Sequence, residues 1–377
     1  MYLLKKAFVY APEKIGLRDL LVIGGKIAAM AENLTVSLPG LETIDVKGLI
    51  VTPGLVDQHI HVTGGGGEGG PISRVPELQL SQLIKAGTTT FVGICGTDTI
   101  TRPIAALLAK VRALTSEGLS GWMYTSNYAL PPGLLSGSVR DDIFLVPEVL
   151  GMKIAHSDHR SSFPTVDEMM RLLSDIRVGG MIAGKVGVMH IHMGDLDGGI
   201  EVFDEIAARG MPLKHLRPTH CERNEKLFKE SLKYTKRGGI IDITSGGDYY
   251  TSFVDLIKEA FSEADIDNVT MSSDGGGSMP RFNASGDVVG LTTCSAAGNL
   301  DGLYELVKAG MPLEKVLPLI TTHPARHLAL KGKGRVDADM DADLCFFSDD
   351  MKLSHVMAKG KFLMRNREII VKGTFEE

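Results

Sequence analysis

The sequence predicts an α/β fold, a (β/α)8 barrel of the TIM type with a small β-sandwich domain built from both chain ends. The first observation is a repeated unit that begins near residue 50. In it, a short apolar run is followed by a polar or glycine-rich tip and then by a helical stretch. Eight such units occur, which is the number that closes a barrel. The second observation is that both chain ends lack this unit and have the pattern of short strands separated by turns.

The expected elements follow one another along the chain. The strands are GLVDQHIH (54–61), TTTFVGICGTD (88–98), GWMYTSNYALP (121–131), GMKIAHSDHR (151–160), GVMHIHMGD (187–195), LRPTHCERN (216–224), GIIDITSGGD (239–248) and VTMSSDGGGS (269–278). Helical patterns such as RPIAALLAKVRALTSEG (102–118) lie between them, and helices over residues 300–330 follow the last strand. We expect the barrel with its trailing helices to span 53–330, and 1–52 together with 331–377 to form the small β-domain.

Composition excludes several classes of function. The 377 residues are 44% hydrophobic, enough for a sizeable core, and the net charge of −6 offers no basic field for nucleic acid or an anionic membrane. The sequence contains no run of about 18 apolar residues, so we expect no membrane span. The N-terminus does not resemble a signal peptide. The four cysteines form no CxxC pair, which favours reduced thiols and a cytoplasmic location: Cys95, Cys221, Cys294 and Cys345.

Histidines and one aspartate end several predicted strands. His59 and His61 are two residues apart, so both imidazoles face the barrel interior. His192 ends the fifth strand, His220 the sixth and Asp274 the eighth. Because the active site of such a barrel lies at the carboxyl ends of its strands, these side chains converge. Four histidines and a carboxylate suit zinc or a similar divalent ion; the alternative is a scatter of unrelated polar residues.

Two further strand residues need an interpretation. Lys153 ends the fourth strand, where a buried cation beside metal ions would be costly unless its charge were changed. His190 repeats the His-X-His spacing with His192. We take His192 as the ligand because it lies nearer the end of the strand, and we expect His190 to be a packed barrel histidine.

The glycine-rich segment GGGGEGGP (64–71) follows the first strand directly. It lacks the Lys-Ser/Thr of a P-loop and the spacing of a dinucleotide site, and a plain linker is not expected at this place. The remaining interpretation is a loop whose backbone, for example at Gly66, passes close to a ligand, since glycine permits close approach and positive φ. Glu68 then projects from a loop that is otherwise free of side chains.

Eight motifs are specific enough for comparison with known families. They are DQHIHVTGGGGEGGP (57–71), GICGTD (93–98), SDHRS (157–161), HMGD (192–195), PTHCERN (218–224), IDITS (241–245), MSSDGGGS (271–278) and VKGTFE (371–376). Together they resemble the isoaspartyl dipeptidase (beta-aspartyl dipeptidase) branch of the metal-dependent amidohydrolase superfamily, along essentially the whole chain. One departure is Glu222, which stands where the motif of that branch has asparagine and adds a negative charge beside Arg223.

The resemblance implies two divalent metal ions per chain, with Zn²⁺ expected. One ion would be bound by His59, His61 and Asp274. The other would be bound by His192 and His220, and a carboxylated Lys153 would bridge the two. The resemblance also implies a homo-oligomer, with an octamer as one option.

The charged residues of the expected barrel mouth indicate a class of substrate. Glu68 is an acid, and Arg160 and Arg223 are arginines of the kind that bind carboxylates in bidentate fashion. One acid and two arginines complement one ammonium and two carboxylates, the groups that a small β-aspartyl dipeptide carries. The resemblance supports Glu68 as the partner of the ammonium. Thr97 and Ser278 are further expected substrate contacts.

The expected reaction is metal-assisted hydrolysis of the β-aspartyl isopeptide bond by a hydroxide shared between two ions. Asp274 would take the proton and pass it to the leaving amine, and Tyr128 would donate a hydrogen bond to the oxyanion. One alternative is another binuclear amidohydrolase, such as a cyclic amidase or an N-acyl amino acid hydrolase. A second, of a different class, is a non-catalytic scaffold on the same fold, which would be expected to have lost metal ligands.

Overall fold

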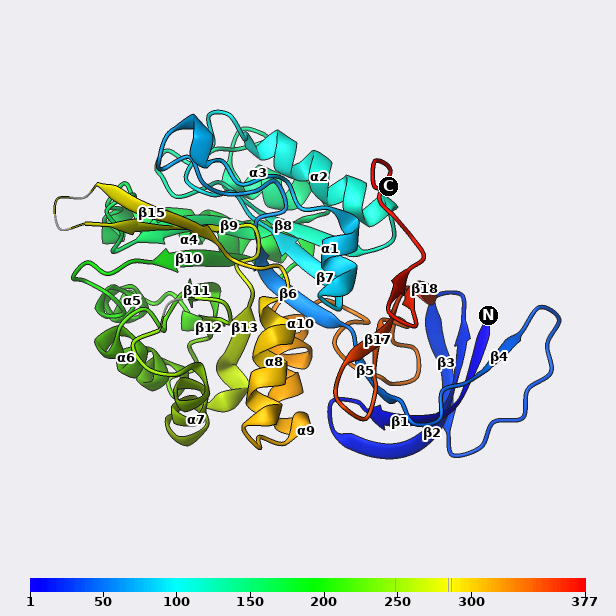
Figure 1. The fold of residues 1–377 in the computed structure, drawn as a ribbon. Helices are drawn as coiled ribbons and strands as arrows, with labels where there is room; N and C mark the ends of the chain where they lie inside the picture. Colours follow the sequence, from blue (N-terminus) through cyan, green and yellow to red (C-terminus); the bar gives the residue numbers. More distant parts are fainter. Residues whose placement is uncertain (248, 284, 286) are drawn as a thin grey trace.

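The computed structural model describes residues 1–247, 249–283, 285 and 287–377 and confirms the α/β barrel architecture (Figure 1). Six parallel strands pair in the order β6 to β11, and β12 pairs with β13. In the described part of the chain, β12 packs beside β11 and β13 beside β6 without a ladder. The bounds are β6 Leu55–Ile60, β7 Thr88–Gly93, β8 Ser120–Thr125, β9 Val149–His156, β10 Val188–Met193, β11 Leu216–Thr219, β12 Ile241–Thr244 and β13 Val269–Ser272.

Helices follow the barrel strands and cover them. In α4 the Thr165 hydroxyl accepts the Glu168 N–H and the Glu168 carboxylate accepts the Thr165 N–H, which starts the helix with a capping box. The helices are α1 Leu80–Lys85, α2 Ile104–Ser116, α3 Val139–Leu145, α4 Val166–Ala183, α5 Glu201–Ala208, α6 Glu225–Thr235, α7 Phe253–Glu263, α8 Gly298–Lys308, α9 Leu313–Val316 and α10 Thr322–His327. Short 3-10 helices are Pro71–Ser73, Leu213–His215, Ile266–Asn268 and Leu317–Ile320.

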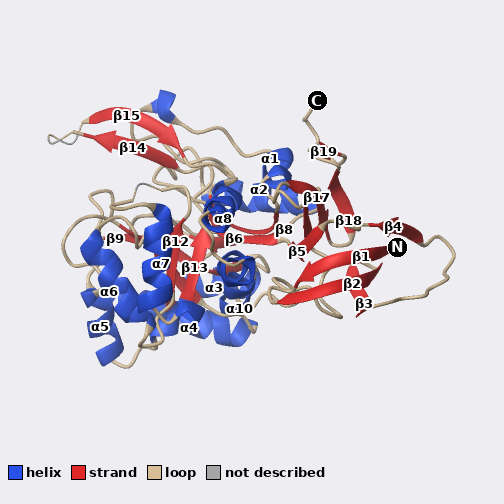
Figure 2. Cartoon of the chain, turned by 60° about the horizontal axis from the view of Figure 1, so that its bottom comes forward, coloured by secondary structure: helices blue, strands red, loops and turns tan. Residues whose placement is uncertain are grey.

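The two chain ends meet in one sheet beside the barrel, as expected (Figures 1 and 2). Strand β5 runs antiparallel to β16, with Val51 opposite Phe346, and this pairing joins the N-terminal to the C-terminal part. The exact domain boundaries stay predictions. The strands are β1 Tyr2–Tyr10, β2 Lys14–Ile23, β3 Lys26–Ala31, β4 Glu42–Asp45, β5 Ile50–Pro53, β16 Leu344–Phe347, β17 Leu353–Ala358, β18 Lys361–Arg365 and β19 Glu368–Ile369.

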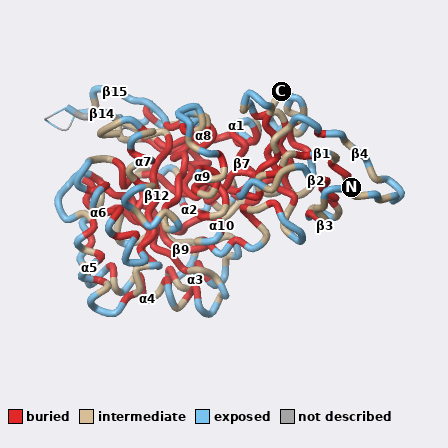
Figure 3. The backbone as a smooth tube through the Cα atoms, turned by 90° about the horizontal axis from the view of Figure 1, so that it is seen from below, coloured by how far each residue is buried: buried red, intermediate tan, exposed pale blue. Residues whose placement is uncertain are grey.

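Buried strands form the centre of the barrel, with exposed segments at its periphery (Figure 3). All residues of β6, β7 and β10 are buried, as expected for parallel strands that are covered on both faces. On α2, Leu107, Val111 and Leu114 make a buried stripe at helical spacing. The small sheet has a separate apolar core that includes Leu4 and Phe346. The barrel strands are therefore held in place by buried side chains on both faces, and their ends position the site.

An antiparallel hairpin that the sequence patterns did not predict follows β13. It consists of β14 Ser278–Phe282 and β15 Val288–Thr293 and extends away from the body of the barrel (Figure 2). Its residues Val289 and Leu291 are exposed. Its two strands pair with one another in a separate sheet. Their sequence therefore lacks the buried apolar face from which a strand can be predicted. None of the described helices is both long and apolar enough to span a membrane.

Candidate active site

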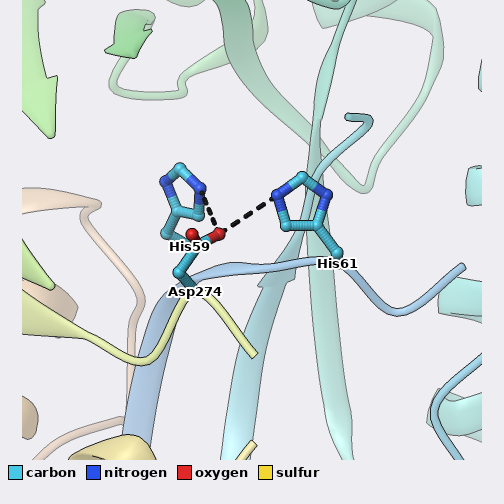
Figure 4. A group of neighbouring side chains, drawn as sticks. All are labelled: His59, His61 and Asp274. Atoms are coloured by element: carbon cyan, nitrogen blue, oxygen red, sulfur yellow. Dashed lines mark ion pairs between the residues drawn. The ribbon is translucent and has the colours of Figure 1, made fainter. Parts of the chain in front are cut away.

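Three predicted metal ligands meet at the carboxyl ends of β6 and β13. The Asp274 Oδ1 atom lies 3.1 Å from the Nε2 atom of His59 and 3.1 Å from that of His61. Figure 4 shows both imidazoles directed at this carboxylate. One potential ligand atom from each residue lies within 4.8 Å of the others. This donor set of two imidazoles and a carboxylate is one that zinc prefers.

The protonation states of His59 and Asp274 suit the binding of a cation between these side chains. Burial, with Lys153 nearby, lowers the pKa of His59 to about 3, so its imidazole is neutral. Burial works against ionisation of Asp274, but the two histidines hold its pKa well below the usual range. Within the described residues, Asp274 Oδ1 and His61 Nδ1 are buried and have no hydrogen-bond partner. A buried carboxylate oxygen that lies 3.1 Å from two imidazole Nε2 atoms and has no donor is expected where a metal ion binds.

Two of the predicted ligands that line the cavity have an unusual backbone conformation. Asp274 has φ 51° and His220 has φ 60°, in the left-handed region that non-glycine residues seldom adopt. Each comes just after a strand, β13 or β11. Next to Asp274, the Ser273 hydroxyl and N–H donate to the buried carboxyl of Asp57, which anchors this turn to β6. Such strain persists only where surrounding contacts hold it, and it is common at functional sites.

Lys153 lies in β9 beside the first ligand group and is completely buried. Its Nζ atom is 3.4 Å from His59 Nε2 and 5.1 Å from the centre of the Tyr128 ring. Burial lowers the pKa of Lys153 to about 7. Burial therefore favours the neutral amine over the ammonium form of this side chain.

His192 and His220 lie next to the first group, with ring centres 4.6 Å apart. Both nitrogens of His192 face protein partners, since Nδ1 is 2.9 Å from the Tyr128 hydroxyl and Nε2 is 2.8 Å from Asp158. His220 Nδ1 contacts the Thr244 hydroxyl at 2.7 Å. The structure therefore brings both histidines to the expected place, but His192 is turned toward Asp158. Their role as ligands stays a prediction.

Asp158 is a central residue that the sequence interpretation left unassigned. Its carboxylate binds the Arg160 guanidinium through two bonds of 2.9 and 2.8 Å, in addition to its contact with His192. Burial opposes its ionisation, yet Arg160 and His192 hold the pKa of Asp158 far below the usual range. The one signal in the sequence was a carboxylate two residues before Arg160 in the motif SDHRS. Asp158 is a second acid at the cavity and pairs with Arg160, so the expected balance of one acid and two arginines becomes two acids and two arginines.

Glu68 is not the isolated acid that the glycine-rich loop indicated. Its carboxylate accepts hydrogen bonds of 3.0 Å from Thr97 and from Ser278, and it pairs with Arg160 at 3.3 Å. Its side chain is only 7% exposed. In the structure Thr97 and Ser278, which we expected to contact the substrate, hold Glu68 in place.

Arg223 is the more open of the two arginines, with 29% of its side chain exposed. Its guanidinium lies 3.7 Å from Asp195, an exposed residue, and 3.4 Å from His192 Nε2. The neighbouring Glu222 is buried, and among the described residues its Oε2 atom has no hydrogen-bond partner. Burial raises the pKa of Glu222 to about 8, so its carboxyl is mostly neutral near pH 7 and only weakly offsets the charge of Arg223.

A cavity of about 450 Å³ joins these groups at the mouth of the barrel. Its size suits a dipeptide-sized ligand. Its wall includes strand-end and loop residues from both sides of the barrel, among them His61, Gly66, Tyr128, Arg160, His192, His220, Glu222, Arg223, Asp274 and Ser278.

The glycine-rich loop is ordered by close backbone contacts. Gly66 has φ 90°, and a Cβ atom there would lie 2.2 Å from the Ser73 carbonyl oxygen. Arg102, which the sequence analysis did not single out, donates to the carbonyls of Gly64, Gly65 and Val75 at 2.5 Å each. Glycine is required here mainly because the loop packs against the following segment. The same packing places Gly66 at the cavity wall.

Comparison with known proteins defines the class of this chain. The sequence profile described as Amidohydrolase family matches residues 149–363. The chain belongs to the amidohydrolase family of hydrolytic enzymes. An allantoinase of Bacillus licheniformis is 23% identical over 89% of this chain and 83% of its own.

Two solved structures are similar over nearly the whole chain. Both are of a beta-aspartyl dipeptidase from Fervidobacterium islandicum AW-1, and each alignment covers 98% of both chains. The one in complex with the beta-Asp-Leu dipeptide is 42% identical with a TM-score of 0.93, and the other is 40% identical with a TM-score of 0.90. A D-hydantoinase, at 15% identity and a TM-score of 0.72, shares the fold.

Proposed function

We propose that this chain hydrolyses β-aspartyl dipeptides in a reaction that depends on divalent metal ions. The observation that carries the proposal is a cavity whose wall brings His61 and Asp274, two members of the His59, His61 and Asp274 group, together with Arg160 and Arg223. The 42%-identical beta-aspartyl dipeptidase bound to beta-Asp-Leu supports this class of substrate. A cytoplasmic location and a homo-oligomer, with an octamer as one option, remain predictions.

The chain would hold two ions, with Zn²⁺ expected. His59, His61 and Asp274 would bind the first, and His192 and His220 the second, for which His192 must exchange its contact with Asp158. When bound, such ions lower the pKa of water and polarise the scissile carbonyl.

Lys153 would bridge the two positions as a carbamate. The neutral amine adds to carbon dioxide, forming an N–C bond and releasing one proton. Burial favours the neutral amine, since it lowers the pKa of Lys153 to about 7. The negative charge of the product would also remove the cost of a buried ammonium beside two cations.

Two side chains would handle the changes of charge in the reaction. Asp274 would accept the proton of the attacking water and deliver it to the leaving amine. Tyr128 would donate to the oxyanion in place of its present contact with His192 Nδ1. Burial raises the pKa of Tyr128, so its phenol keeps the proton that it must donate.

The loop residues would read the charged groups of the dipeptide. Glu68, oriented by Thr97 and Ser278, would receive the ammonium group. Arg223 would bind the α-carboxylate of the aspartyl residue, because it is the more open arginine. Arg160 would bind the C-terminal carboxylate while Asp158 holds its guanidinium in a fixed orientation.

The alternatives make different demands on the cavity. A cyclic amidase with a small neutral substrate has no need for Glu68, Arg160 and Arg223. An N-acyl amino acid hydrolase needs one arginine and no partner for an ammonium group. A scaffold without activity has no need for strained ligand positions such as Asp274.

The test is to measure hydrolysis of β-Asp-Leu, α-Asp-Leu and a hydantoin by one preparation whose metal content is determined in parallel. We expect a clear preference for β-Asp-Leu, two metal equivalents per chain and loss of activity with chelators. Equal cleavage of the two isomers, or activity on the hydantoin alone, would overturn the substrate assignment. A metal-free active sample would overturn the mechanism.

A further inference from the structure

His190, expected from the sequence to be only a packed residue, contacts the proposed metal site directly. Its Nε2 atom lies 2.7 Å from His59 Nδ1, and it is completely buried in β10. Strand pairing places it opposite Lys153 on β9. His190 therefore reaches the side of the His59 ring that faces away from Asp274.

A second ring fixes the plane of His190. The Tyr124 ring stacks on it, with centres 4.8 Å apart and planes 21° from parallel, while the His59 ring is 4.9 Å away on another side. All three side chains are buried. The imidazole is therefore restrained between two rings, as a group that orients another residue must be.

The contact determines where the protons lie on both histidines. His59 Nε2 faces Asp274 at 3.1 Å and needs a free lone pair to bind a metal ion. The proton of a neutral His59 must then sit on Nδ1 and be donated to His190. Because that bond requires an acceptor, His190 Nε2 carries no proton, and the proton of the neutral His190 ring is on Nδ1. His190 is completely buried, which favours the neutral ring.

We infer that His190 is a positioning residue that fixes the tautomer and ring orientation of His59 for metal binding through the bond between His59 Nδ1 and His190 Nε2. The inference rests on the proposed metal site but not on the identity of the substrate. Packing alone does not account for it, since an apolar ring of similar size would fill the space between Tyr124 and His59. Such a ring would leave the His59 Nδ1–H without an acceptor and would favour the tautomer that cannot bind the ion.

Two variants separate positioning from packing. His190→Phe keeps an aromatic ring but removes the acceptor, whereas His190→Gln keeps a carbonyl oxygen that reaches about as far as the lost Nε2 atom and can accept. His355→Gln, in β17 of the small sheet, is the matched control. The measurement is the dissociation constant of Zn²⁺ by chelator competition, with metal content per chain and circular dichroism as a check on folding.

We expect His190→Phe to weaken Zn²⁺ binding by about 10- to 100-fold, the range for lost partners of ligand histidines. His190→Gln should recover most of this loss, and the control should bind as the wild type does. Wild-type affinity in a folded His190→Phe protein, or equal loss in both His190 variants, would overturn the inference. Failure to cleave β-Asp-Leu would overturn the proposed function but leave this result intact.

Neutron diffraction from the zinc-loaded wild type provides a test that needs no variant. We expect deuterium on Nδ1 of both His59 and His190. Deuterium on His190 Nε2, directed at His59, would overturn the assignment even if the His190→Phe protein did not fold.

Discussion

The floor and the rim of the cavity are built in different ways. On the floor, His59, His61 and Asp274 lie on strands or directly after them, in positions that barrel packing and a strained backbone fix. On the rim, Glu68 and Arg160 lie on loops and depend on contacts between side chains. From this difference we expect the barrel to define the chemistry and the loops to define the substrate, so that changes on the rim alter selectivity without loss of metal.

The largest expected effect comes from the floor. Asp274→Asn removes both a proposed ligand and the proposed proton carrier, so kcat on β-Asp-Leu should fall by roughly 100- to 10,000-fold. Circular dichroism should show a retained fold. Near-normal turnover would mean that another group moves the proton.

Lys153→Ala tests the bridge between the two proposed ions. Activity should be lost together with at least part of the bound metal, because a shared ligand is removed. Small carboxylic acids such as acetate or propionate should restore part of the activity by replacing the carbamate oxygens. Full activity with two metal equivalents per chain would rule out the bridging role.

On the rim, Arg223→Met should reduce selectivity while metal content stays constant. An α-linked peptide has no free carboxylate on the α-carbon of its aspartyl residue, the position that Arg223 would bind. Because an unpaired group in the site costs a few kcal/mol, the wild type should discriminate by roughly 100-fold or more. The ratio of kcat/KM for β-Asp-Leu and α-Asp-Leu measures this. An unchanged ratio in Arg223→Met would contradict the assignment of Arg223.

Glu68→Gln should weaken the binding of β-Asp-Leu, because the proposed partner of the ammonium group loses its charge, while the metal content stays constant.

Arg102→Met should make the glycine-rich loop at the rim less ordered, because Arg102 donates to the loop carbonyls of Gly64 and Gly65 and to the carbonyl of Val75 in the following segment. We expect about a tenfold rise in KM, equivalent to about 1.4 kcal/mol, with nearly unchanged kcat and metal content. Arg112→Met, which removes an exposed ion pair with Glu148, is the matched control. A loss of metal in Arg102→Met would show that floor and rim are not independent.

The effect with the least influence on catalysis is on stability and its dependence on pH. Burial raises the pKa of Glu222 from 4.5 to about 8. Between these values the folded chain binds more protons than the unfolded chain, so the free energy of unfolding falls as pH rises, by up to about 1.4 kcal/mol per unit. Glu222→Gln removes this contribution and should gain stability relative to the wild type from pH 5 to pH 8, measured by urea unfolding. Parallel curves would contradict the burial of an ionisable group.

The floor residues could be predicted from the sequence and the rim contacts could not, because a strand fixes the direction of its side chains and a loop does not. His59 and His61 could be placed because period two on a buried strand fixes their direction. The partners of Glu68 could not, since Ser278 is 210 residues away in the chain and meets Glu68 only through loop conformation. The sequence likewise shows Asp158 two residues before Arg160 in the motif SDHRS, but the contact between Asp158 and His192 could not be predicted from it. The β14–β15 hairpin was missed because its exposed residues carry no core pattern.

The central claim is that the strand-borne floor holds the ions and the loop-borne rim does not. Anomalous diffraction at the zinc edge, from wild-type crystals grown with zinc, tests it most directly. The account predicts one peak within about 2.0–2.2 Å of His59 Nε2, His61 Nε2 and Asp274, and a second beside His192 and His220. A map with no peak at the His59, His61 and Asp274 group, or with zinc bound only by rim residues such as Glu68, would contradict it.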